Sequence, residues 1–199
     1  MQNPKIVKTT DPKTKRLLAK HTDQWKDCEL CDLHKTATNH VLVRGRLPCT
    51  VLFVGEAPGE IEDMTGAPFH PRAPAGKILQ RMIDTAQETA IKRFTYAVTN
   101  ILACAPWTDT NLLRPPEKSE AKACSPRLLS IFSLAQPRLV VSLGKTASKY
   151  LTSSMHDVPV LELNHPAYLA RKGGLTSLEY KRCLLKLNRT IQEINHGKA

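Results

Sequence analysis

The chain has 199 residues, of which 41% are hydrophobic and 24% charged, with a formal net charge of +11. This is the composition of a globular domain and not of a disordered, collagenous or coiled-coil chain. No apolar run approaches the roughly 20 residues that a membrane span needs, and the polar N-terminus lacks an apolar signal core. We therefore expect a cytoplasmic protein, in a reducing compartment, with no membrane partner.

The positive charge lies at the two ends of the chain. Residues 1–26 and residues 165–199 each hold seven basic and two acidic residues, whereas the middle of the chain is nearly neutral. Basic surfaces of this kind bind polyanions through phosphate contacts and counterion release, so nucleic acid is the leading candidate partner. A basic surface that only meets solvent is an equally good interpretation of the charge by itself.

Strand-like and helix-like segments alternate along the chain. Residues 13–25 predict a short basic helix in the N-terminal segment. Apolar runs that predict strands then alternate with helical apolar spacing, in the order 50–54, 76–89, 95–99, 117–135, 138–143, 144–151, 158–163 and 177–195. This alternation predicts a parallel sheet with helices on both faces, and such sheets bind ligands at the carboxyl ends of their strands.

The first predicted strand is followed by a tight turn, Gly55-Glu56-Ala57-Pro58-Gly59. Its glycines and proline suit a fixed loop whose backbone approaches a ligand closely. Carboxylates are dense here, because Glu56 is followed by Glu60, Glu62 and Asp63. One of them could orient water or stabilise a developing cation. The alternative is a simple turn and helix start, where acidic residues favour the helix dipole.

Three further side chains stand at positions where a base could bind. Phe69 lies in a proline-rich stretch and could stack on a flat base, although a core anchor is as good an interpretation. Asn100 ends a predicted strand with an amide that suits a pyrimidine edge, although such residues more often cap turns. His165 follows the last predicted strand and could donate a proton, although a lone histidine is more often structural.

Apolar and basic residues follow His165 on a loop that ends in glycine: Tyr168, Leu169, Arg171 and Lys172. Apolar wedges flanked by phosphate-binding cations are how proteins disturb a duplex. We therefore expect this loop to hold DNA, with Tyr168 or Leu169 as the wedge.

Six cysteines are many for a chain expected in a reducing compartment, where disulfides are disfavoured. Cys28 and Cys31 form a CxxC pair, and Cys104 and Cys124 lie far along the chain. Such a two-plus-one-plus-one set can ligate either an iron–sulfur cluster or zinc. The remaining two, Cys49 and Cys183, are expected to be buried small hydrophobes.

The run VGEAPGEIEDMTGAPF at residues 54–69 resembles the first motif of family 4 uracil-DNA glycosylases, the iron–sulfur type of the uracil-DNA glycosylase superfamily. Further matches follow the family's order over roughly residues 25–190. They are the CxxC pair, TNILACAP at 99–106, Glu120 with Cys124, PRLVVSLGKTA at 137–147 and NHPAYLAR at 164–171.

This resemblance implies an α/β/α three-layer sandwich around a four-stranded parallel sheet, within one domain at residues 25–199 that follows a basic extension at 1–24. It implies a [4Fe–4S] cluster on Cys28, Cys31, Cys104 and Cys124. It also implies a monomeric, monofunctional DNA repair enzyme. Its reaction would be hydrolysis of the N-glycosidic bond of deoxyuridine in single- or double-stranded DNA, releasing uracil and leaving an abasic site.

The resemblance also assigns roles to residues. The catalytic group consists of Glu56, Glu62 and His165, and the uracil-binding group of Gly55, Ala57, Phe69 and Asn100. Ala57 stands where other uracil glycosylases carry an acid, so the separate roles of Glu56 and Glu62 are left open. No insert with a reactive histidine is found, so no covalent DNA adduct is expected.

Three features depart from the family pattern. Residues 69–76 are longer by two residues and richer in proline, the interval between Cys104 and Cys124 carries an extra loop at 107–113, and residues 1–24 are not required by the family. These departures motivate an alternative, a DNA-binding or uracil-sensing protein with weak or no excision. A glycosylase for another damaged base is a third, weaker hypothesis.

Overall fold

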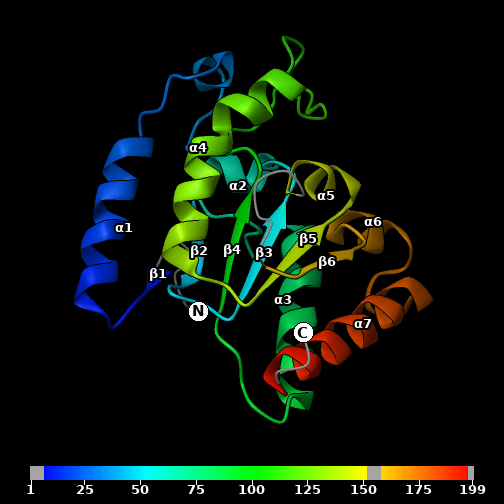
Figure 1. Cartoon of the computed structure of the whole chain (residues 1–199). Helices are drawn as coiled ribbons and strands as arrows, with labels where there is room; N and C mark the ends of the chain where they lie inside the picture. Colours follow the sequence, from blue (N-terminus) through cyan, green and yellow to red (C-terminus); the bar gives the residue numbers. More distant parts are fainter. Residues whose placement is uncertain (1–6, 152–157, 197–199) are drawn as a thin grey trace.

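The structure is a computed structural model that describes residues 7–151 and 158–196, and it places a six-stranded sheet between two layers of helices (Figure 1). The strands are β1 Val7–Lys8, β2 Arg44–Arg46, β3 Val51–Gly55, β4 Tyr96–Asn100, β5 Leu139–Leu143 and β6 Val160–Leu163. The helices are α1 Pro12–Trp25, α2 Glu60–Thr65, α3 Pro74–Thr89, α4 Lys118–Ala135, α5 Lys145–Leu151, α6 Pro166–Arg171 and α7 Leu178–Asn195. Short 3₁₀ turns occupy Asp32–Lys35 and Gly174–Thr176.

The sheet has the strand order β1-β2-β4-β3-β5-β6, and its last four strands are parallel. These four are the predicted strands, so the α/β sandwich with a parallel sheet at its centre is confirmed, although the whole sheet has six strands and not the expected four. Two further strands were not predicted: β2 pairs antiparallel with β4, and β1 pairs parallel with β2. The strand β2 has three residues and β1 has two, and both have little apolar character. They therefore give no strand pattern in the sequence.

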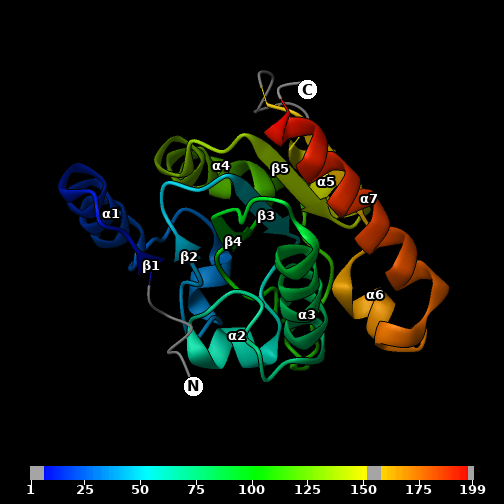
Figure 2. The ribbon, with the colours of Figure 1, turned by 90° about the horizontal axis from the view of Figure 1, so that it is seen from below.

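The alternation of side chains along β3 sends its residues into two separate cores. Leu52 and Val54 pack with residues of α1, α4 and α5 on one face. Val51 and Phe53 pack with residues of α3, α6 and α7 on the other face. Figure 2 shows α3, α6 and α7 gathered on the second face. The central strands are covered on both faces, so a parallel sheet is favoured over an antiparallel one.

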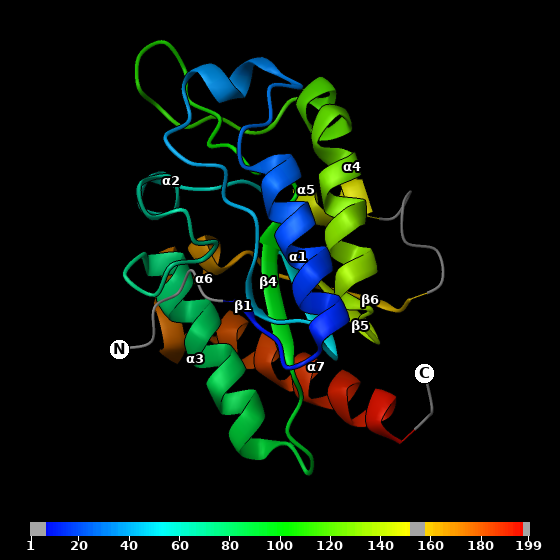
Figure 3. The same cartoon turned by 90° about the vertical axis from the view of Figure 1, so that its left-hand side faces the viewer.

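The N-terminal helix α1 lies along α4 (Figure 3). His21 Nδ1 lies 2.8 Å from Ser130 Oγ, and Trp25 is buried in the same core as α4. Residues 12–25 therefore pack on the domain with one face, while their basic side chains face away from the buried side. Residues 1–6 of the expected basic extension lie outside the described residues, and its boundary at residue 24 stays a prediction.

The expected loop after β6 is a short helix, α6. Pro166 stands at its first position, where the missing N–H costs nothing, and His165 caps it with Nδ1 accepting from the Ala167 N–H at 3.2 Å. Through residues 7–151 and 158–196, no helix has the length and apolar character to cross a bilayer.

Candidate active site

The carboxyl ends of the parallel strands meet at one edge of the sheet, as predicted. Gly55 at the end of β3 is in register with Asn100 at the end of β4. The turn after β3 and the start of α6 after β6 line one open cleft. Predicted site residues on its wall are Glu56, Ala57, Glu62, Phe69, His165 and Arg171. Asn100 lies beneath this wall and is fully buried.

Gly55 permits the closest contacts of the site. A Cβ on this residue would lie 2.3 Å from Asn100 Oδ1, 2.5 Å from Phe69 Cε2 and 2.6 Å from Phe69 Cζ. These distances are far below van der Waals contact, so no other residue fits here without moving both side chains. What approaches the glycine backbone is therefore the amide of Asn100 and the ring of Phe69.

Phe69 is held by its backbone as well as by packing. Its φ of +48° is rare for a residue with a side chain, and its exposed fraction is 2%. Its ring centroid lies 5.7 Å from that of His165, with 42° between the ring planes. The two extra residues in the segment 69–76 therefore do not remove the ring from the cleft wall.

A buried arginine fixes the Phe69 segment from beneath. Arg44 in β2 donates from Nε to the Pro68 carbonyl at 2.6 Å and from Nη2 to the Phe69 carbonyl at 3.2 Å. These two bonds hold the chain where φ is positive, so Arg44 is a positioning residue for the ring. Sequence reasoning missed it, because a single arginine in a short polar segment carries no pattern.

Asn100 and Glu62 form a buried polar pair. Asn100 Nδ2 donates to Glu62 Oε2 at 3.2 Å, while Asn100 Oδ1 is buried and has no hydrogen-bond partner among residues 7–151 and 158–196. Burial raises the pKa of the Glu62 carboxyl to about 7, although the Asn100 amide and the backbone of Phe69 act to lower it. A free acceptor beside a tunable carboxyl is suited to reading a polar base edge.

The raised pKa of Glu62 predicts how the stability of the folded chain depends on pH. The folded chain binds this proton more tightly than the unfolded chain, because the pKa rises from 4.5 to about 7 on folding. The stabilising contribution is therefore complete below pH 4.5 and is lost as pH rises through about 7. We expect the melting temperature of the wild type minus that of Glu62→Gln to fall between pH 5 and pH 8. Thermal melts in matched buffers measure this, and a difference that is flat with pH would contradict the shift.

His165 is placed as a neutral hydrogen-bond donor. Burial, and secondarily the charge of Arg171, lowers its pKa to about 4. Because Nδ1 accepts from the Ala167 N–H, the proton of the neutral ring lies on Nε2. The ring therefore lines the cleft with one fixed N–H donor at physiological pH.

The carboxylates after β3 divide between the cleft and the scaffold. The half-buried Glu56 lines the cleft, whereas Asp63 accepts from the Thr38 N–H at 3.0 Å and from Trp107 Nε1 at 3.1 Å. Asp63 thus anchors the extra loop at 107–113, which a bridge between Trp107 and Leu113 closes. Leu113 also lines the cleft, so this loop forms part of its rim.

The four residues expected to bind DNA differ in exposure. Tyr168 is 37% exposed, whereas Leu169 is fully buried in the core shared with α3 and α7. Lys172 Nζ lies 5.8 Å from the centroid of the Tyr168 ring, and Arg171 lines the cleft. Of the two expected wedges, Tyr168 is the one that this structure presents to a ligand, because Leu169 anchors α6.

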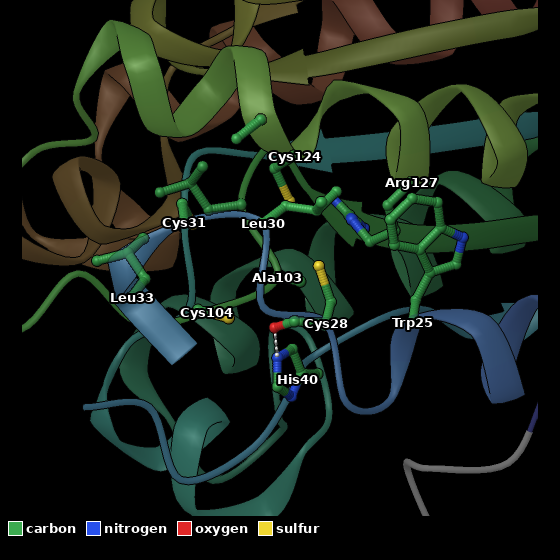
Figure 4. A pocket seen from close by; sticks show the side chains of 12 residues that line it. Trp25, Cys28, Leu30, Cys31, Leu33, His40, Ala103, Cys104, Cys124 and Arg127 are labelled. Atoms are coloured by element: carbon green, nitrogen blue, oxygen red, sulfur yellow. Dashed lines mark hydrogen bonds between the residues drawn. The ribbon is translucent and has the colours of Figure 1, made fainter. Parts of the chain in front are cut away.

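The four cysteines of the expected ligand set line a second pocket (Figure 4), which shares no lining residue with the cleft. Cys28 and Cys31 come from the segment after α1, Cys104 follows β4 and Cys124 lies in α4. Within the described residues, no three His, Cys, Asp or Glu side chains are gathered closely enough to hold one metal ion. Cys49 and Cys183 are buried elsewhere, at 5% and 6% exposure, as predicted.

Comparison with known proteins identifies the family. The sequence model of the uracil DNA glycosylase superfamily matches residues 44–190. A type-4 uracil-DNA glycosylase of Thermotoga maritima is 31% identical over 180 residues, which cover 83% of this chain and 88% of that protein. Type-4 uracil-DNA glycosylases of Sulfurisphaera tokodaii and Saccharolobus solfataricus are 36% and 34% identical over 69% and 67% of this chain. The chain spans 59% and 58% of the length of these two relatives. It belongs to the uracil-DNA glycosylase superfamily and, within it, to the type-4 family.

Proposed function

We propose that this chain removes uracil from DNA by hydrolysing the N-glycosidic bond of deoxyuridine. One observation carries the proposal: Phe69, Asn100 and His165, from three separate segments, are brought together at the carboxyl edge of the parallel sheet. They supply an aromatic face and a neutral N–H donor on the wall of the cleft, and an amide directly beneath that wall. The similarity to type-4 uracil-DNA glycosylases supports the same substrate.

Recognition follows from these three groups. The deoxyuridine leaves the stack, which costs a few kcal/mol and less from a single strand. Phe69 stacks on the flipped base, and the Asn100 amide pairs with its edge. Asn100 Oδ1 accepts from the N3–H of uracil, and the Nδ2 hydrogen that is not bonded to Glu62 donates to uracil O4. Cytosine carries an acceptor at N3 and an amino donor at position 4, so an amide held in this orientation rejects it. Ala57 lines the cleft with no more than a methyl group, and Gly55 admits the Asn100 amide and the Phe69 ring that bind the base.

The chemistry is a hydrolysis at C1′. As the bond from C1′ to N1 breaks, its electron pair goes to the uracil and positive charge develops on the sugar. The Nε2–H of His165 donates a hydrogen bond to the uracil anion. Glu56 or Glu62 orients the water that adds to C1′ or offsets the charge of the sugar. The water loses one proton as its oxygen bonds to C1′, and that proton ends on the uracil anion, so the products are free uracil and an abasic site.

We propose that Tyr168, Arg171 and Lys172 hold the DNA beside the cleft, with Leu169 anchoring their helix. Tyr168→Ala is expected to slow excision from a duplex several-fold while changing excision from a single strand little, because only the duplex must be unstacked. Single-turnover rates on the two substrates measure this ratio. Equal losses on both would show that Tyr168 does not act as a wedge.

We propose that Cys28, Cys31, Cys104 and Cys124 hold a [4Fe–4S] cluster. Thiolates around one zinc ion lie about 3.8 Å apart, given zinc–sulfur bonds of about 2.3 Å. Four thiols that share a pocket without such a tight grouping fit a larger group better. When bound, the cluster supplies an iron–sulfur core capable of electron transfer. The cysteines tie the N-terminal segment to the region between β4 and α4.

Cys28→Ser is expected to lower the iron content and the visible absorbance of the purified chain. A serine hydroxyl is a poor substitute for a thiolate ligand of iron. Cys49→Ser, outside the pocket, is the matched control and should keep both signals. Iron analysis of the two variants and the wild type decides the assignment, and equal iron in Cys28→Ser and wild type would overturn it.

Product analysis tests the proposed activity. The chain is incubated with a duplex that carries one uracil, and the free base is identified by mass spectrometry. Release of uracil with a remaining abasic site is expected. Salt-sensitive DNA binding with no released base would favour the alternative of a DNA-binding protein on this scaffold.

A further inference from the structure

Arg127 is buried at 1% exposure between the cysteine pocket and the end of β4. Its Nη2 donates to the carbonyls of Asn100 at 2.5 Å and Ile101 at 2.8 Å. Its Nη1 donates to Thr99 Oγ1 at 3.0 Å. One guanidinium on α4 therefore binds the backbone of the residue whose side chain lies against Gly55 and Phe69.

Among the residues that the structure describes, no carboxylate balances the charge of this guanidinium. Its partners are carbonyls and a hydroxyl, and no ion pair found within residues 7–151 and 158–196 includes it. Burying a cation without a counter-charge is costly. The neutral acceptors offset part of the free-energy cost of burying the charge. A negative group nearby would offset the rest.

Two unused donors lie at the same place. Arg127 Nε and Trp25 Nε1 are both buried and have no hydrogen-bond partner in the described part of the chain, and both residues line the cysteine pocket. Figure 4 shows the two side chains beside each other near Cys28 and Cys124. The pocket thus combines four thiols, a buried cation and two N–H donors whose hydrogen bonds are unmade within the described residues.

We propose that Arg127 is the counter-cation of the cluster and, through the Asn100 carbonyl, a positioning residue for base recognition. The inference rests on the proposed cluster. A cluster ligated by four thiolates is an anion with sulfur acceptors. It would supply the negative charge that balances Arg127 and the acceptors for the two N–H donors. The Trp25 indole N–H serves as a second donor to the same group.

The proposal predicts a coupling between the cluster and Arg127. Reduction adds negative charge to the cluster, and a nearby cation stabilises the reduced form, so its loss lowers the reduction potential. Removal of the cluster from the wild type leaves Arg127 buried without a counter-charge, which destabilises the apo chain. A variant without the cation does not bury an unbalanced charge when the cluster is removed, so its apo chain should lose less stability.

The experiment compares reconstituted wild type with Arg127→Met by midpoint potential and by the difference in melting temperature between the iron-loaded and iron-free chains. We expect Arg127→Met to shift the potential to more negative values and to show a smaller loaded-minus-free difference. Arg44→Met is the matched control, because Arg44 is also buried, at 5% exposure, but donates to carbonyls outside the cysteine pocket. It should leave the potential unchanged.

Two further variants cover a failure of Arg127→Met to fold. Arg127→Lys keeps the charge and should keep a potential close to the wild type, whereas Arg127→Gln loses the charge and should lower it. Potentials that are the same in all Arg127 variants that carry iron, together with an unchanged loaded-minus-free difference, would overturn the role of Arg127. A wild-type chain that binds no iron after reconstitution would overturn the cluster itself.

Discussion

Replacement of His165 by alanine is expected to slow uracil excision by a factor of about 10² to 10³, the usual cost of removing one donor to a developing anion. The substitution removes the Nε2–H that lines the cleft, and it also removes the Nδ1 cap of α6. Loss of such a cap costs about 1 kcal/mol, so the fold should persist. Single-turnover rates on saturating uracil-containing DNA measure the chemical effect.

The protonation state of His165 provides the control for this experiment. Burial lowers its pKa to about 4, so the wild-type ring is neutral throughout the range from pH 5 to pH 8. The ratio of wild-type to His165→Ala rates should therefore be constant over that range. A ratio that falls with an inflection near pH 6.5 would show that the charged imidazolium acts. A rate within a few-fold of the wild type would remove His165 from the reaction.

Replacement of Gly55 by alanine is expected to abolish excision and to lower the melting temperature. The added methyl would lie 2.3 Å from Asn100 Oδ1 and 2.5 Å from the Phe69 ring, and β3 is a central strand that is paired on both sides. The side chains must move instead of the backbone. Their displacement fills the proposed base site, and overpacking in a core costs about 1–3 kcal/mol.

Gly59→Ala is the matched control for Gly55→Ala. It lies in the same turn, but a Cβ there would meet nothing within 4 Å, and its φ of −88° suits any residue. We expect it to keep its melting temperature and most of its activity. If Gly55→Ala behaved like Gly59→Ala, the close contact of Gly55 with Asn100 and Phe69 would not be what shapes the base site.

The parallel strands and the long helices follow from local patterns. The run at 51–55 is continuously apolar because both faces of β3 are covered, and α3 and α7 carry apolar residues at helical spacing on one side. The convergence of the turn at Gly55, of Asn100 and of His165 follows from the rule that ligands bind at the carboxyl ends of parallel strands. Those parts of the site could be predicted from the chain alone.

The supports of the site could not be predicted in this way. Arg44 and Arg127 are buried, but in the sequence each is one arginine among many in a basic chain. Their roles depend on backbone carbonyls far along the chain, which only tertiary packing brings near. Leu169 likewise has the pattern of an exposed wedge, and its burial becomes evident only when α6 is placed against α3.

Uracil-dependent strand scission is the measurement that tests the proposed function most directly. An end-labelled single-stranded oligonucleotide with one internal uracil is incubated with the iron-loaded chain and cleaved with alkali, beside a matched thymine oligonucleotide. The arrangement of Phe69, Asn100 and His165 predicts cleavage at the uracil position alone. An intact uracil strand after treatment with iron-loaded protein would contradict the proposed excision.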